Sequence, residues 1–214
     1  MYIMDVIYDK FSINNISFAS KKQNAIPFSF LCILLFSFTL MGCTNNVVTL
    51  SYPLAHDALS PDNTRNISVC IVDFSNNRKE SAVGKQQNNT QLLPRTPVER
   101  WLATGLALEL QHAGFQILMA ESLPEAIARK ADYIVTGESE EVWLMETSIT
   151  RYTGVVRASI SLLDGVGNHI TRNAYSSVYS KAVLPIYGVP QTLLDDALVE
   201  MLQPAVDLLA KTMQ

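Results

Sequence analysis

A charge-free apolar run near the N-terminus divides this chain into a part that can form a folded domain and a part that cannot. The run covers residues 26–41, follows the basic pair Lys21-Lys22 and is closed by Gly42 and Cys43. It is shorter than the ~20 apolar residues that a membrane-spanning helix needs. A basic segment, an apolar segment and a small residue at its end are the three parts of an export signal. We therefore expect residues 1–42 to be a signal peptide with an upstream extension, outside the fold.

The cysteine directly after the run makes this prediction more specific. Leu40-Met41-Gly42-Cys43 resembles the lipobox of bacterial lipoproteins, in which the signal is cut before the cysteine and the cysteine is acylated. The resemblance implies cleavage between Gly42 and Cys43 and lipidation of Cys43. Each buried methylene of a lipid contributes about 0.8 kcal/mol, so several acyl chains attach a protein to a membrane almost permanently. An uncleaved membrane anchor or a buried core helix is the alternative interpretation of the apolar run.

The segment after Cys43 has the composition of a linker. Residues 43–65 are rich in Asn, Thr, Ser, Pro and Asp, as expected of a lipid-anchored tether, and a β-prone island at residues 47–52 can add an edge strand. Thr44 stands where enterobacterial lipoproteins that stay in the inner membrane carry Asp. That resemblance implies a periplasm-facing lipoprotein of the bacterial outer membrane, with the inner membrane as the less favoured location.

Charge and cysteine content argue against a nucleic-acid-binding protein and against a domain held by an intramolecular disulfide. The formal net charge is −4 and no cluster of Lys and Arg occurs, so nucleic acid is excluded as a partner. Cys32 leaves with the signal and Cys43 is predicted to be acylated, which leaves Cys70 without a partner for an intramolecular disulfide. Cys70 lies among β-branched residues with no neighbouring His or basic residue, so we interpret it as a buried thiol and not as a nucleophile.

Two segments predict the core elements of a domain. Residues 67–74 are apolar on both alternating sets of positions, which is typical of a central strand covered on two faces. A helix is predicted to begin at the capping-box sequence of residues 96–99 and to end before Gly114. Its apolar residues recur every three or four positions, and they form one packing face.

The rest of the chain predicts more strands and a second long helix. Residues 156–162 alternate between apolar and polar side chains, the pattern of a strand with one wet face, and residues 164–168 form a turn to a partner strand. The last segment is an amphipathic helix that Pro204 is expected to bend or divide. The predicted strands are residues 67–74, 115–119, 131–138, 142–145, 156–162 and 169–183, and the helices are residues 97–113, 123–130 and 193–209.

This order of elements predicts one α+β domain over residues 66–214. We expect a mixed, mostly antiparallel β-sheet with two main helices packed on one face. Residues 75–95 are interpreted as a long polar loop, and loops of that length are usually functional or mobile.

The sequence offers no catalytic, cofactor-binding or metal-binding residues, and we predict a protein that is not an enzyme. His56, His112 and His169 are scattered, and each has a structural interpretation as a loop, helix-end or strand-end residue. The acidic residues 138–141 lack the turn pattern of a hard-metal site and are interpreted as a solvated strand end or bulge. No Gly-x-Ser-x-Gly or His-Glu-x-x-His sequence is present.

Three landmarks resemble a known group of envelope proteins. These are residues 69–74 followed by Asn76-Asn77-Arg78, a helix that ends in residues 110–115, and residues 131–138. They look like the landmarks of small bacterial envelope lipoproteins, most closely of the YajG-type family, and the fold is similar to the amino-terminal domain of TolB and to CsgG-type domains. The resemblance implies this fold and an envelope location but no particular activity.

Two classes of function follow. The first is a non-enzymatic lipoprotein that serves as an accessory interaction protein in envelope assembly or transport, with the membrane and an envelope protein as partners. Its narrower variant is an auxiliary lipoprotein of an ABC-type lipid transporter. The other class is an envelope hydrolase that uses Ser, His and an acid, which would require one of the scattered histidines to lie beside a Ser and a carboxylate in the fold.

Overall fold

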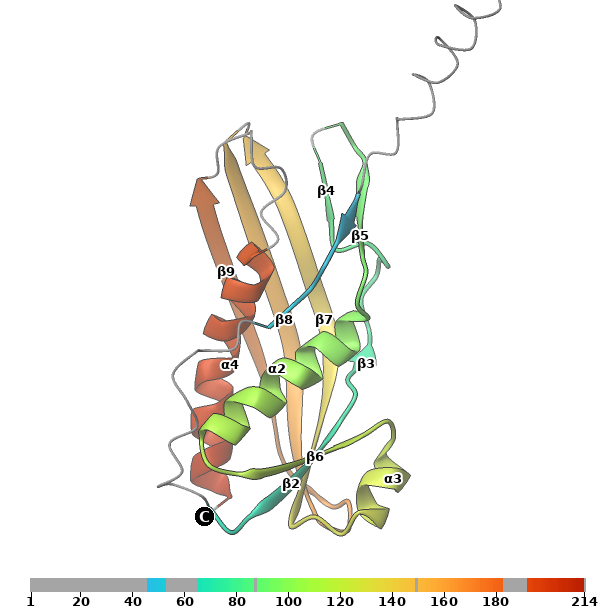
Figure 1. Cartoon of the computed structure of the whole chain (residues 1–214), viewed down its shortest axis with the longest axis vertical. Helices are drawn as coiled ribbons and strands as arrows, with labels where there is room; N and C mark the ends of the chain where they lie inside the picture. The colour runs from blue at the N-terminus through green and yellow to red at the C-terminus, as the bar shows by residue number, and fades with distance from the viewer. Residues whose placement is uncertain (1–45, 53–64, 87, 149, 183–191, 214) are drawn as a thin grey trace, which may run out of the picture. The chain divides into compact units, whose positions relative to one another are not determined.

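The computed structural model describes residues 46–52, 65–86, 88–148, 150–182 and 192–213. These residues form three helices and nine strands (Figure 1). In chain order they are β1 (Val47–Val48), β2 (Ser68–Val72), β3 (Ser75–Asn76), β4 (Gly84–Lys85), β5 (Gln91–Pro94), α2 (Val98–His112), β6 (Gln116–Ala120), α3 (Leu123–Ala128), β7 (Tyr133–Ser148), β8 (Arg151–Asp164), β9 (His169–Ala182) and α4 (Thr192–Thr212).

The long strand β7 organises the sheet. One of its edges pairs antiparallel with β8 over almost the whole of both strands, and β8 pairs in the same way with β9. The other edge of β7 is shared by β2, β3 and β4, which pair with it in parallel one after another. Beyond these, β6 lies next to β2, and β5 and β1 lie beyond β4. The sheet is therefore mixed, and its long ladders are antiparallel, which confirms the predicted fold class.

The two main helices pack on one face of this sheet and on each other (Figure 1). The apolar residues of each helix pack against those strand residues that point toward the helices, which are every second residue of a strand. This agrees with the amphipathic patterns of the sequence. α4 continues through Pro204 as one helix. The largest fully buried side chains of this layer are Ile71, Leu92, Leu102, Leu106, Leu110, Leu144, Leu162, Leu193, Leu194, Leu198 and Met201.

The short helix α3 covers the opposite face at one end of the sheet. Val69 and Ile71 of β2 belong to the main core, whereas Cys70 and Val72 belong to a second buried cluster that includes Ala126 of α3. Successive strand residues point to opposite faces, so β2 is covered on both of them. This burial on both faces explains the two-sided apolar pattern of residues 67–74. However, the strand at the centre of the pairing is β7, and β2 is an inner strand between β6 and β7.

Residues 75–95 do not form a loop, and this correction alters the edge of the sheet. They contain β3, β4 and β5, of which β4 and β5 form an antiparallel hairpin. Gly84 permits the close approach of β4 to β7, because a Cβ atom there would lie 2.3 Å from the carbonyl oxygen of Leu144. The strands escaped sequence reasoning because they are two to four residues long and have few apolar side chains.

Two smaller features also differ from the sequence prediction. Helix α2 begins at Val98 with Pro97 at its N-cap and no side-chain cap, so the predicted capping box is absent. The segments 131–138 and 142–145 are one strand, β7, interrupted by a register shift between Ser139 and Glu141. This shift confirms the interpretation of the acidic residues as a bulge.

We predict that Gly137→Ala destabilises the domain by about 1–3 kcal/mol, the usual cost of overpacking a core. A Cβ atom at Gly137 would lie 2.3 Å from the ring of Phe74, whose side chain is buried. Urea unfolding measured by circular dichroism tests this. The double variant Gly137→Ala/Phe74→Leu should recover part of the loss, because the smaller side chain makes room. An unchanged midpoint in the single variant would contradict the predicted clash.

Candidate functional site

The residues predicted from the lipobox, Gly42 and Cys43, lie outside the described residues, so their role stays a prediction. The described chain begins at Asn46, which is hydrogen-bonded to the folded body. The Asn46 carbonyl accepts a hydrogen bond from the Leu93 N–H at 2.8 Å, and the Asn46 side chain donates to the Gln91 carbonyl at 3.0 Å. The β-prone island thus forms an edge strand, β1, which pairs in parallel with β5. We call residues 46–52 the strap.

The strap lies across both main helices. Val48 and Leu50 are buried in the main core, at 1% and 3% exposure. The Trp101 indole of α2 donates a hydrogen bond to the Ser51 carbonyl at 3.2 Å. Tyr52 donates from its hydroxyl to the Glu109 carboxylate and packs over Gly105, where a Cβ atom would lie 2.8 Å from the ring.

Asp195 connects the strap to α4. Its Oδ2 accepts a hydrogen bond from the Ser51 hydroxyl at 3.3 Å, and its Oδ1 is buried without a partner among the described residues. Burial raises the pKa of Asp195 to about 6, and the hydrogen bond from Ser51 and the nearby Trp101 indole only partly offset that effect. A carboxyl group with this pKa carries a proton in the folded state at mildly acidic pH.

The other residues singled out in the sequence do not come together. Cys70 is fully buried and forms no disulfide, which confirms the interpretation as a buried thiol, and burial raises the pKa of that thiol. His112 is exposed at the end of α2 and His169 is exposed at the start of β9. His56 lies outside the described residues. The structure therefore does not join His112 or His169 to the acidic residues 138–141 as a catalytic group.

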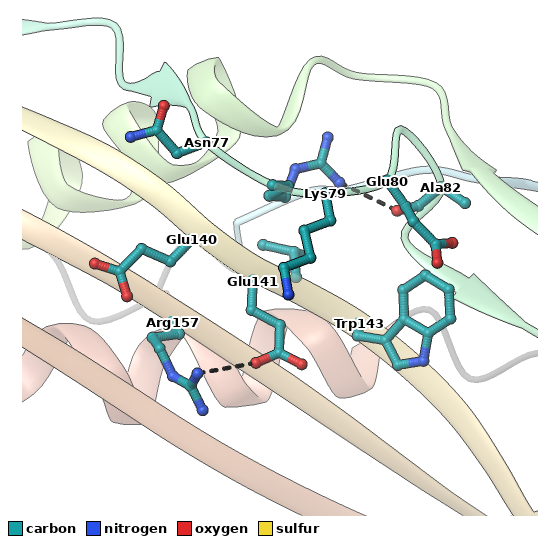
Figure 2. A pocket seen from close by; sticks show the side chains of 10 residues that line it. Asn77, Lys79, Glu80, Ala82, Glu140, Glu141, Trp143 and Arg157 are labelled. Carbon is teal, nitrogen blue, oxygen red and sulfur yellow. Dashed lines mark hydrogen bonds and ion pairs between the residues drawn. The ribbon is translucent and has the colours of Figure 1, made fainter.

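A cavity of about 380 Å³ lies between the crossover from β3 to β4 and the sheet face opposite the main helices (Figure 2). One wall is the segment 77–82 and the other is the bulged part of β7 together with Arg157 of β8. Because the bulge adds one residue to β7, Glu140 and Glu141 both line this cavity. Trp143, two residues further along β7, adds a half-buried aromatic ring to the wall.

The cavity carries balanced charge. Its lining includes Arg78, Lys79 and Arg157 and the three carboxylates Glu80, Glu140 and Glu141. These charged side chains do not all form ion pairs with one another. Arg157 is paired with Glu141 (Figure 2), and their charged atoms lie 3.3 Å apart. Glu140 instead accepts a hydrogen bond from the Ser159 hydroxyl.

Arg78 is a structural part of the cavity wall. Its guanidinium donates to the Ala82 carbonyl at 3.2 Å and to the Asn76 side chain at 3.1 Å, and both bonds hold the 77–82 segment in its turn. Burial lowers the pKa of Arg78, and the nearby Glu99 carboxylate opposes this effect. The lining thus suits a polar ligand that both donates and accepts hydrogen bonds, because it has paired charges of both signs beside an aromatic ring.

A second cavity, of about 450 Å³, lies where β2 and β6 end beside α3. Arg100 spans it, 3.0 Å from the Asp73 carboxylate and 3.5 Å from that of Glu121, and Arg129 pairs with Glu125 at 2.7 Å. The cations of this cavity already have carboxylate partners within it. We therefore interpret Arg100 as a link between α2 and the residues that follow β2 and β6, and the Arg129–Glu125 pair as internal to α3 and its C-cap.

Sequence reasoning missed the first cavity because its walls come from distant parts of the chain. Asn77 and Arg157 are brought together only by the pairing of β3 and β8 with the two edges of β7. The one local signal was the acidic run at residues 138–141, where the alternating pattern of β7 is broken. Within the described residues, no group of three or more His, Cys, Asp and Glu side chains could hold a metal ion. None of the described helices is long and apolar enough to cross a membrane.

Comparisons with known proteins support the fold. No protein-family model and no curated protein matches this sequence. Among solved structures, the chain is similar to protein XCC0632 from Xanthomonas campestris, assigned to the family DUF330. The TM-score is 0.55 and the identity 9%, over 78% of this chain and 96% of that one. This likeness extends over nearly the whole domain and agrees with the α+β fold described above.

Two other solved structures are more distant. A PelC dodecamer from Paraburkholderia phytofirmans has a TM-score of 0.43 and 17% identity, over 72% of this chain and 93% of that one. The lipoprotein GNA1162 from Neisseria meningitidis has a TM-score of 0.36 and 13% identity, over 68% of this chain and 99% of that one.

We predict that Asp195→Asn makes the stability of the domain less dependent on pH. The pKa of Asp195 is raised from 3.8 to about 6 on folding, so the folded state binds a proton in this window that the unfolded chain has released. Its contribution to stability therefore falls as the pH rises through the window. In the wild type we expect the free energy of unfolding to fall by on the order of 1 kcal/mol across this window, a value discounted for solvent screening. In Asp195→Asn this fall should be absent.

Urea unfolding across this pH range measures the effect. Asp207→Asn is the matched control, since Asp207 is exposed on the same helix and should leave the pH dependence unchanged. Equal pH dependence in the wild type and in Asp195→Asn would show that Asp195 is already ionised in the folded state at low pH.

Proposed function

We propose that this protein is a non-enzymatic bacterial lipoprotein, attached through an acylated Cys43 to the outer membrane, that serves as an accessory interaction protein in envelope assembly or transport. The observation that carries the proposal is the position of the lipobox relative to the fold. The described strap begins at Asn46, three residues after Cys43, and its backbone and side chain are hydrogen-bonded to β5 from there on. Cleavage before Cys43 would therefore leave the strap and the rest of the domain intact.

The interaction role is supported by the kind of surface that the sheet presents. The first cavity has charges of both signs, an aromatic ring and an amide, and such a lining recognises a partner by hydrogen bonds and stacking. The outer-membrane location is supported by Thr44 at the position after the cysteine. We place the partner among envelope proteins because the attached domain would face the periplasm.

Attachment is tested by measuring the mass and location of the exported protein. We expect the wild type to carry the mass of the lipid on Cys43, to lack residues 1–42 and to sediment with outer membranes. Cys43→Ala should lose the lipid mass and the membrane association together, because the thiol is the acylation site. Cys70→Ala is the control, since Cys70 is buried in the domain and should leave both properties unchanged. A wild type that is membrane-bound without lipid would contradict the proposal.

The partner is tested by crosslinking in intact cells followed by purification of the full-length lipoprotein. We expect Trp143→Ala and Arg157→Glu to weaken a reproducible crosslink to an envelope protein, because both side chains line the first cavity. His169→Ala, at the exposed start of β9, is the control. Crosslinks that are unaffected by the cavity variants would show that the partner binds a surface other than the first cavity. A permease or substrate-binding component as the partner would narrow the role to an auxiliary lipoprotein of an ABC-type lipid transporter.

A further inference from the structure

The strap allows very little free chain between Cys43 and the folded body. Asn46 is held by its backbone and by its side chain. Its carbonyl accepts a hydrogen bond from the Leu93 N–H, and its side-chain amide donates one to the Gln91 carbonyl. Three residue steps separate Cys43 from Asn46, and a fully extended chain covers at most about 3.6 Å per step, or ~11 Å in all. An anchor at Cys43 therefore holds Asn46 close to the lipid surface.

This reach is short compared with the length of the sheet. Strand β8 has 14 residues, which span roughly 46 Å at about 3.3 Å per residue. Thr150 lies just before β8, in the turn from β7, and Val166 lies just after it, in the turn to β9. The greatest distance that the chain allows between Cys43 and Asn46 is about a quarter of the length of β8. The end of the sheet that contains Asn46 must therefore stay near the membrane.

The turn with Thr150 belongs to the same end of the sheet as Asn46. Asn46 bonds to Gln91, which is paired with Lys85 of β4, and Lys85 is paired with Met145 of β7, close to the β7–β8 turn. Figure 1 shows the β4–β5 hairpin and the end of β7 toward one end of the folded domain, and α3 with the β8–β9 turn toward the other.

The end of the sheet that contains Asn46, which we call the strap end, carries charges that suit a membrane surface. Lys85, Arg151 and Lys181 are exposed at the strap end, with Glu146 beside them. The hairpin tip adds neutral hydrogen-bonding groups, including the exposed Asn88 and Asn89. Cations and amides of this kind suit phosphate-bearing lipid headgroups, which attract Lys and Arg by about 1 kcal/mol each near an anionic surface.

We propose that the end of the sheet formed by the β4–β5 hairpin tip and the β7–β8 turn is a membrane-contacting surface that binds phospholipid headgroups, and that α3 and the β8–β9 turn point away from the membrane. The proposal rests on the attachment at Cys43. It adds an orientation, and it places the first cavity along the side of the domain, between the membrane and the free end.

The test compares the two ends of β8 in the lipidated full-length protein. Thr150→Cys and Val166→Cys, both exposed, each receive a fluorescent thiol label, while Cys43 is acylated and Cys70 is buried. The labelled proteins are reconstituted into phosphatidylethanolamine and phosphatidylglycerol vesicles whose headgroups carry a nitroxide quencher. We expect quenching to be several-fold stronger at position 150 than at position 166. Equal quenching, or stronger quenching at position 166, would overturn the orientation.

A linker variant tests the reach itself. Twenty Gly and Ser residues inserted between Thr44 and Asn45 add an r.m.s. length of about 25 Å. Quenching at position 150 should fall toward that at position 166, while flotation with the vesicles is unchanged. Unchanged quenching at position 150 would show that the short chain does not set the orientation, and would overturn that step.

The mass spectrum of the reconstituted protein separates this proposal from the proposed function. Lipid on Cys43 together with equal quenching rejects the orientation and leaves the attachment in place. A protein without lipid on Cys43 rejects the attachment, and with it the orientation, before any quenching is measured.

Discussion

The antiparallel pairing of β7 with β8 is the interaction on which the other elements depend. It joins residues that are adjacent in sequence, from Tyr133 to Asp164, and so forms at a small cost in chain entropy. Once made, it leaves one long edge of β7 open, and β2, β3 and β4 pair with successive parts of that edge. Strands of two residues have no stability alone, so β3 and β4 exist because β7 offers a preformed template.

The bulge in β7 gives the two faces of the sheet different roles. On one face, alternate residues of β7 and β8 are apolar and are sealed by α2 and α4. The opposite face is divided along its length, with α3 covering one end and the charged cavity, which includes Trp143 in its wall, occupying the middle. Val155 and Val178 stand beside Trp143 on the next two strands. Because the bulge brings both Glu140 and Glu141 to this face, it builds the cavity wall without disturbing the packing of Val142 and Leu144 behind it.

Sequence reasoning succeeded where one side-chain pattern extends over a whole element. The alternation at residues 156–162, the two-sided apolar run at residues 67–74 and the Gly114 stop each reflect a local physical requirement, and each predicted its element. The strands of residues 75–95 and the first cavity could not be predicted in this way, because their partners are far away in the chain and their polar residues satisfy no local period. Conversely, Cys43 is indicated by its neighbours in sequence alone, and no feature of the fold repeats that information.

The strap also determines how a mechanical load would enter the domain. In a chain held at Cys43, a pull on the body is transmitted through Asn46. It is resisted first by the two backbone hydrogen bonds that join Asn46 to Leu93 and Val48 to Arg95. Behind them, Val48 and Leu50 are inserted in the core, and Ser51 and Tyr52 are bonded to α4 and α2. Tension would therefore peel the strap residue by residue before it reaches the long ladder of β7 and β8. Each residue released would lengthen the free chain by about 3.5 Å, so force alone could move the domain away from its support without unfolding the sheet.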